Sequence, residues 1–372
     1  MAARPASSSR STGTSTAVRP TPPATPRVRD FATPAVGFTI EWDVRPVFDF
    51  LFSLTSEVGK TEDLPEVDRT WLRDARAAVP EAIRDEFDGV FASEMGIYVA
   101  AFAVERPDLT TVDAFVEAVD TVSTDDLLRA ILCDLERDAD LGGLVKQAGA
   151  GDKDALRALQ KAMPEHKVGF QALLSDPVDA HRRIVVVLRA WAQVFNEIEP
   201  RIRAIIERDH ALRAADRGAF DGSELIERTT GGIRWLPEVG IRRVFLAPSY
   251  FSRPYNFLLA GDDWRFFGYP VSDDALEGDD RLAPPPAVVR LHRALGDETR
   301  LRILKLLASQ DLYLTEIAQH LDLSKPTIKH HLALLRAAGL VTVVEAGTVI
   351  YYSLRRDRIE SASAELGRFL ST

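Results

Sequence analysis

The chain has little cysteine and no long apolar run. Cys133 is the only cysteine among 372 residues, which excludes a disulfide framework within the chain and agrees with a reducing compartment. No uninterrupted apolar run reaches the length that spans a membrane. Hydrophobic residues make up 46% of the chain and charged residues 27%, as in globular domains. We therefore expect a cytoplasmic protein that does not use a membrane as a partner.

Sequence motifs of catalysis are also missing. The chain lacks the GxxxxGK[ST] loop that cradles phosphate, GxGxxG after a strand, HExxH, GxSxG and CxxC. The paired carboxylates at Asp262-Asp263 and Asp279-Asp280 fall in turn or linker sequence, where solvent-exposed side chains are more common than acid-base catalysts. The sequence predicts a protein that is not an enzyme, with no catalytic residue and no cofactor. An enzyme domain or a protein-docking domain as one part of the chain is the alternative.

The segment LTEIAQHLDLSKPTIKHHLALL, residues 314–335, predicts a helix-turn-helix. Thr315 is predicted to cap the first helix, and Ser324 the second, with Pro326 in the first turn of the second helix. Asp322 occupies the turn position that requires a left-handed conformation, which Asp tolerates better than most residues. The apolar positions recur at helical spacing and predict one buried face. They are Ile317, Ala318, Leu321, Ile328, Leu332 and Leu335.

The flanking sequence completes a small domain. After Gly339, LVTVVEAGTVIYYSL holds two runs of β-branched and aromatic residues around a short turn, which predicts a β-hairpin. Upstream, VVRLHRALGDETRLRILKLLAS predicts two helices separated at Gly296, the second of them capped by Asp297. The predicted order is helix, helix, helix-turn-helix, hairpin, helix.

Together, ALGDETRLRIL, LTEIAQHLDLSKPTIKHHLALLRAAGLV and the strand ending in YYSL resemble the ArsR-type (ArsR/SmtB-like) winged-helix transcriptional regulators of bacteria. The resemblance covers residues 287–370. It implies that residues 324–338 form the recognition helix, and that a homodimer binds a palindromic site on double-stranded DNA, with repression as the expected outcome. It also implies that residues 288–295 and 359–370 build the dimer interface. Longer proteins of this type, with an uncharacterised N-terminal domain, resemble the rest of the chain faintly.

The predicted DNA contacts follow from the face of the second helix opposite the buried stripe. The hairpin tip lacks arginine, so two arginines that follow the hairpin are expected to replace it. Residues 287–372 hold 12 Lys and Arg against 9 Asp and Glu, a net +3, whereas the preceding residues hold 34 against 47, a net −13. The basic charge therefore lies where DNA is expected. The predicted DNA-binding residues are Ser324, Lys325, Pro326, Thr327, Lys329, His330, Ala333, Arg336, Arg355 and Arg356.

Metal sensing is not expected. Metal-sensing members of the family carry cysteines in the first helix of the motif, and this chain has none there. His320, His330 and His331 are close in sequence, but adjacent residues on a helix point about 100° apart. We predict that His331 packs at the core edge, that His330 faces DNA or solvent, and that no metal site forms.

The remainder of the chain divides by composition. Residues 1–34 are rich in Ser, Thr, Pro, Ala and Arg and predict a disordered tail, with a transit signal or a DNA-touching basic arm as alternatives. Residues 35–272 predict an N-terminal helical domain with a small β-sheet, residues 273–285 an acidic and proline-rich linker, and residues 286–372 the winged helix-turn-helix. The fold class is therefore α+β and mostly helical, with helices from Trp71 to Arg217 that break near Pro200.

The N-terminal domain carries the open functional question. Three strands are predicted between Arg243 and Pro270, a stretch with nine of the 30 aromatic residues of the chain. These aromatics form either a core between sheet and helices, the favoured interpretation, or the lining of an apolar ligand pocket. The domain is accordingly predicted to sense a small-molecule effector or to mediate assembly.

Overall fold

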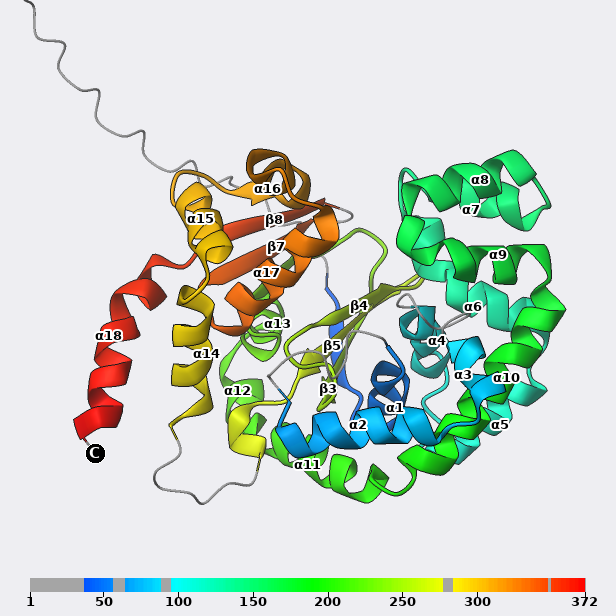
Figure 1. Cartoon of the computed structure of the whole chain (residues 1–372), viewed down its shortest axis with the longest axis horizontal. Coiled ribbons are helices and arrows are strands. Elements are labelled where there is room, and N and C mark those ends of the chain that lie inside the picture. Colours follow the sequence, from blue (N-terminus) through cyan, green and yellow to red (C-terminus); the bar gives the residue numbers. More distant parts are fainter. Residues whose placement is uncertain (1–36, 56–63, 88–94, 277–283, 347–348, 372) are drawn as a thin grey trace, which may run out of the picture.

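A computed structural model of the protein describes residues 37–55, 64–87, 95–276, 284–346 and 349–371. The predicted tail at residues 1–34 and most of the predicted linker lie outside the described residues, as does the hairpin tip at Gly347 and Thr348. The described part is a mostly helical α+β fold, which confirms the predicted fold class (Figure 1). The division into domains at residues 273–285 stays a prediction.

The N-terminal part of the chain, up to residue 276, is mainly helical. The predicted break in the longest helical segment is confirmed, because α10 ends at Phe195 and α11 begins at Glu199, with Pro200 in its first turn. The helices of this part are α1 (Val47–Ser53), α2 (Glu66–Ala78), α3 (Glu81–Glu86), α4 (Met95–Val104), α5 (Val112–Thr121), α6 (Thr124–Arg137), α7 (Gly142–Gly149), α8 (Lys153–Ala162), α9 (Lys167–Ser175), α10 (Pro177–Phe195), α11 (Glu199–Leu212), α12 (Ala214–Ala219) and α13 (Gly222–Thr229), with the short 3-10 helices η2 (Pro164–His166) and η3 (Asp273–Ala275).

A four-stranded sheet lies at the centre of the molecule (Figure 1). Its strand order is β1-β3-β5-β4, in which β1, β3 and β5 are parallel and β4 is antiparallel to β5. A tight turn joins β4 to β5, and in it the amide of Gly261 donates to the carbonyl of Trp264 at 3.0 Å. The strands are β1 (Thr39–Trp42), β3 (Arg243–Ser249), β4 (Phe257–Ala260) and β5 (Trp264–Pro270).

Both faces of this sheet are covered. On one face Phe245 and Phe266 join the large core of the helical part, where the rings of Phe48 and Phe266 lie 4.7 Å apart. On the other face Leu246 and Phe267 belong to a second cluster. Successive side chains of a strand point to opposite faces, so the near-continuous apolar run of β3 supplies both cores.

The predicted aromatic cluster is part of these cores. Eight of its nine members are at most 8% exposed, which favours the core interpretation over an apolar ligand pocket. Tyr255 is the half-buried exception. The buried members are Phe245, Tyr250, Phe251, Phe257, Trp264, Phe266, Phe267 and Tyr269.

The C-terminal part has the predicted winged-helix order. A strand that was not predicted, β2 (Ile233–Leu236), pairs in parallel with β7 and extends the wing sheet to the order β2-β7-β8-β6. Trp235 and Ile233 of β2 pack in the second cluster together with Val343 of β7. The elements are α14 (Pro286–Leu295), α15 (Glu298–Leu307), β6 (Leu312–Tyr313), α16 (Leu314–Leu321), α17 (Lys325–Ala337), β7 (Val341–Ala346), β8 (Val349–Leu354) and α18 (Arg356–Ser371).

Candidate nucleic-acid interface

The helix-turn-helix forms as the sequence predicts. Asp322 adopts φ 54° and ψ 46°, the left-handed conformation expected at the turn between α16 and α17. The amide of Leu323 donates to the carbonyl of Ala318 at 3.1 Å and closes the turn. The predicted apolar stripe is buried, with Ile317, Ile328 and Leu335 fully inaccessible. This packing sets the direction of α17 and leaves its other side for contacts outside the small core.

Two of the three predicted caps are confirmed. The Oγ of Ser324 accepts from the amide of Thr327 at 3.3 Å, and the carboxylate of Asp297 accepts from the amide of Arg300 at 2.8 Å. The prediction for Thr315 is wrong, because the N-cap of α16 is Tyr313, two residues earlier, and the helix begins at Leu314. There the carboxylate of Glu316 accepts from the amide of Tyr313 at 2.8 Å.

The N-terminal half of α17 presents the predicted polar and basic side chains to solvent. Ser324, Lys325, Pro326, Thr327 and Lys329 are all exposed. They occupy the N-cap and first turns, where amide groups without intrahelical acceptors and the positive end of the helix dipole favour anions. Two ammonium groups beside them add charge suited to phosphate oxygens or guanine acceptors. Ala333, one turn further along, is half-buried.

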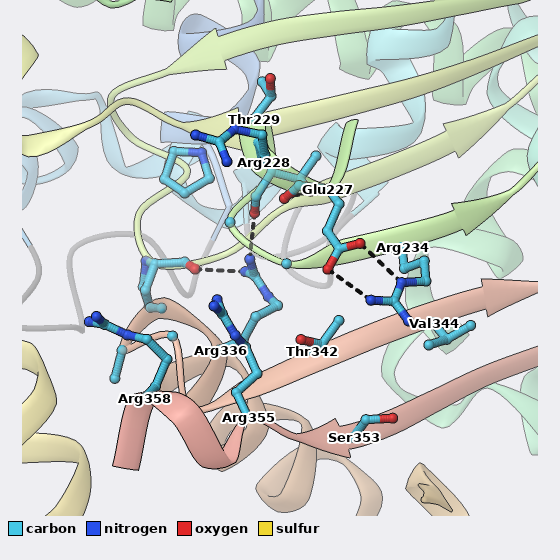
Figure 2. Close-up of a pocket in the computed structure, with 18 of the residues that line it drawn as sticks. Glu227, Arg228, Thr229, Arg234, Arg336, Thr342, Val344, Ser353, Arg355 and Arg358 are labelled. Carbon is cyan, nitrogen blue, oxygen red and sulfur yellow. Dashed lines mark hydrogen bonds and ion pairs between the residues drawn. The ribbon is translucent and has the colours of Figure 1, made fainter. Parts of the chain in front are cut away.

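Arg336 is a correction to the predicted interface. Its side chain is 6% exposed and turns toward the N-terminal part of the protein, away from any groove-facing surface. Nη1 donates to the carbonyl of Thr230 at 2.9 Å, and Nη2 donates to the carbonyl of Pro254 at 3.0 Å (Figure 2). The helical wheel places Arg336 near the edge of the buried stripe but contains no information about the segments from the N-terminal part of the chain that cover this edge. The structure therefore places this arginine among buried residues and not on the exposed face of α17.

A histidine of α17 also contacts the N-terminal part of the chain. His330 is exposed, yet its Nδ1 lies 2.8 Å from the hydroxyl of Tyr255, which follows the cis peptide bond between Arg253 and Pro254. Half-buried His331 lies 3.7 Å from the carboxylate of Asp297, and burial lowers its pKa despite that carboxylate. The sequence predicted that His331 is the more buried of the two histidines, and the structure agrees. Nothing in the sequence indicated that Tyr255 is a partner of His330.

The arginines after the hairpin are engaged locally. Nη2 of Arg355 pairs with Asp357 at 3.2 Å in an exposed ion pair, and the guanidinium of Arg356 donates to the carbonyl of Ala308. Exposed pairs of this kind are weak, so Arg355 keeps the freedom to change partners. Whether either residue contacts DNA stays a prediction.

Ionisable groups inside the N-terminal domain are held in packed surroundings. Burial raises the pKa of Asp49 to about 6, and its carboxylate accepts from Ser249 Oγ at 2.6 Å and from the amide of Phe251 at 2.8 Å. Burial also raises the pKa of the Cys133 thiol to about 12, which keeps this sulfur protonated and unreactive at neutral pH. In the described part of the chain, no group of three or more His, Cys, Asp and Glu side chains is placed to hold a metal ion.

A three-helix core, a helix-turn-helix with an exposed basic second helix and a β-hairpin define the winged helix-turn-helix class of DNA-binding proteins. A family model described as bacterial regulatory protein, arsR family, matches residues 297–343. The chain belongs to this family. Among the described residues, no helix is both long and apolar enough to cross a membrane.

Named relatives agree with this assignment. The chain is 44% identical over 62 residues to the transcriptional repressor SdpR of Bacillus subtilis, a match covering 17% of this chain and 69% of that protein. It is 39% identical over 80 residues to the HTH-type transcriptional regulator CmtR of Mycobacterium bovis, covering 22% and 68%. A third, a SmtB-homologous transcriptional repressor of Synechocystis, is 32% identical over 77 residues, covering 21% and 58%. Each match covers about a fifth of this chain, so most of the chain has no counterpart in these matches.

Proposed function

We propose that this protein is a sequence-specific transcriptional regulator that represses its target by inserting the N-terminal half of α17 into the major groove of double-stranded DNA. The exposed residues Ser324, Lys325, Pro326, Thr327 and Lys329 carry the proposal, because they form an exposed basic surface on a helix whose apolar side is buried. The relatives named above support the same role, since two of them are described as transcriptional repressors.

The proposed contacts follow from the chemistry of each group. Ser324 and Thr327 hydroxyls, together with the amides of the first turn, suit phosphate oxygens. Lys325 and Lys329 suit guanine O6 and N7 or a phosphate, and Pro326 with Ala333 can contact a thymine methyl. The recognition surface is therefore shorter than the sequence indicates and excludes Arg336.

We also propose that the protein acts as a homodimer through α14 and α18, which lie at one edge of the molecule (Figure 1). In α18 only Ala362 is buried, while Ile359 is 36% exposed and Leu370 is 73% exposed. An amphipathic helix with this much exposed apolar surface gains stability when a second copy covers it. Such a dimer would present two α17 helices to two half-sites.

The N-terminal domain is proposed to act as a sensor of a small-molecule effector. It contacts α17 through the carbonyls of Thr230 and Pro254 and through the hydroxyl of Tyr255. A ligand that changes the position of these groups would change the orientation of α17, and would couple its own binding to that of DNA.

Binding of the full-length protein to the DNA upstream of its own coding region tests the proposal. Fluorescence anisotropy at several salt concentrations, with unrelated DNA as competitor, should show tight binding that resists the competitor. Weak binding that salt abolishes would contradict sequence-specific recognition. Light scattering on the same sample should give the mass of two chains.

A further inference from the structure

A large polar cleft lies between the two parts of the protein. Its volume is about 1390 Å³, enough for a ligand of nucleotide size. One wall comes from α13 and the loop that leads into β2, and the other from the end of α17, the wing strands and the start of α18 (Figure 2). The segment at Arg253 and Pro254 and the helix α14 close the remaining sides.

The cleft has an excess of positive charge. Its lining includes nine arginines against five carboxylates, and three of the arginines, Arg213, Arg228 and Arg358, pair with carboxylates that lie outside the lining, so the excess is small. The single carboxylate of Asp273 serves both Arg253, at 2.7 Å, and Arg290, at 2.8 Å. The nine arginines are Arg213, Arg228, Arg234, Arg253, Arg290, Arg336, Arg355, Arg356 and Arg358, and the carboxylates are Glu224, Glu227, Asp273, Asp311 and Asp357.

Arg336 is the most unusual of these arginines. Its hydrogen bonds go to the carbonyls of Thr230 and Pro254, and among the described residues it forms no ion pair. Burial lowers the pKa of this guanidinium to about 10, as expected for a cation that lacks a neighbouring anion. A buried charge without a counterion costs stability, and a bound anion would remove that cost.

The surroundings of Arg336 suit an anion with further polar groups. Gly231 and Gly232 adopt φ of +69° and +112°, and this loop brings its backbone close to the guanidinium. Thr342 of β7 and Ser353 of β8 add hydroxyl groups to the facing wall (Figure 2). Arg355, whose exposed pair with Asp357 is weak, stands on the same wall and can turn to a ligand.

We propose that this cleft binds a small anionic metabolite through a phosphate or carboxylate group held by Arg336 and Arg355. The bound anion would compete with the carbonyls of Thr230 and Pro254 for the guanidinium of Arg336. Because Arg336 belongs to α17, this competition would change the position of α17, and its effect on DNA binding rests on the proposed function. Binding of the anion and binding of DNA would then affect each other reciprocally.

Calorimetric titration of the full-length protein with pyrophosphate and with citrate, at constant ionic strength, tests the proposal. We expect saturable binding of at least one probe. Tighter binding of pyrophosphate indicates a phosphate ligand, and tighter binding of citrate a carboxylate ligand. Arg336→Gln should weaken that binding about tenfold or more, since a charge-assisted pair is lost, and Arg355→Gln should weaken it several-fold. If Arg336→Gln fails to fold, Arg355→Gln alone decides.

Two controls locate the binding. Arg302→Gln removes an exposed arginine of α15 that does not line the cleft and should leave probe affinity unchanged. The double substitution Lys325→Ala and Lys329→Ala should also leave it unchanged, because these lysines lie on the proposed DNA surface. No saturation by either probe, unchanged affinity in Arg355→Gln, or loss of binding in the lysine variant would overturn the proposal. Anisotropy with DNA on the same samples separates this failure from a failure of DNA recognition.

Discussion

The two halves of α17 have the same amphipathic pattern but different surroundings. In the first half, Lys325 and Lys329 are exposed, while in the second half Arg336 is buried against the N-terminal part of the chain. Both halves bury their apolar stripe in the winged-helix core, so the difference comes from the segments around Thr230 and Pro254, which cover only the C-terminal end of α17. One helix can thus be exposed near its N-terminus and packed against a distant segment of the chain near its C-terminus.

The largest expected effect concerns the hydrophobic cluster in which strands from the N-terminal part of the chain pack with β7 of the winged helix. Trp235 is fully buried, and its ring lies 5.1 Å from that of Phe38 and 6.1 Å from that of Phe267. Trp235→Ala should lower the free energy of unfolding by about 3 to 5 kcal/mol, because a large aromatic volume is lost from a packed core. Urea denaturation measures this change. Val239→Ala, at a site 85% exposed, is the matched control, and a loss below about 1 kcal/mol in Trp235→Ala would contradict the role of this core.

The next largest effect concerns the two buried ionisable side chains Arg336, in α17, and Asp49, in α1. Arg336 keeps hydrogen bonds to two carbonyls, whereas Asp49 has Oδ2 buried without a partner among the described residues. Because burial raises the Asp49 pKa from 3.8 to about 6, the folded protein binds this proton more tightly than the unfolded chain does. The contribution of Asp49 to stability is therefore largest below about pH 4 and decreases as the pH rises toward 6.

Asp49→Asn should remove this part of the pH dependence. The difference between the variant and the unmodified protein should change by on the order of 2 to 3 kcal/mol between pH 4 and pH 7. Denaturation of both proteins at several pH values measures this difference in the free energy of unfolding. Other carboxyls, such as Asp134, whose pKa burial also raises to about 6, titrate in both proteins, so their contribution cancels in the difference. Parallel pH profiles for both proteins would show that Asp49 titrates normally.

The exposed half of α17 should contribute to affinity and little to stability. Lys325→Ala and Lys329→Ala should each weaken DNA binding by about 1 to 3 kcal/mol for a base contact, or lower the salt slope by about 1 for a phosphate contact. Anisotropy at several salt concentrations distinguishes the two. Lys153→Ala, an exposed lysine of α8, is the control. If both α17 variants keep the original affinity and slope, this half of α17 does not enter the groove.

The smallest expected effect lies at the boundary between the halves. Tyr255→Phe removes the hydrogen bond to His330, which should free that side chain and tighten DNA binding by about 0.5 to 1.5 kcal/mol. A double-mutant cycle with His330→Ala isolates the contribution of this contact. Additive effects in the cycle would mean that the contact does not restrain α17.

Much of the winged helix could be predicted because its signals are local. Ser324 and Asp297 cap helices within three residues, and the conformation of Asp322 follows from its place in a turn. The pairing of β2 with β7 joins Ile233 to Val343, about a hundred residues later, and no spacing within a four-residue strand indicates that partner. The burial of Arg336 was missed for the same reason, because its partners at Thr230 and Pro254 are equally remote.

The sequence by itself determined the helices and the hairpin of the winged helix, the caps at Ser324 and Asp297, the apolar stripe of α17 and the family, since each depends on residues a few positions apart. Only the tertiary structure decided that β2 joins the wing sheet, that Arg336 lines a cleft between the N-terminal and C-terminal parts of the chain, and that Tyr255 lies within hydrogen-bond distance of His330. Helical periodicity shows which side of a helix faces its own small core. Whether the other sides of the helix are exposed or buried depends on which distant segments of the chain pack against them, and only the complete fold decides this.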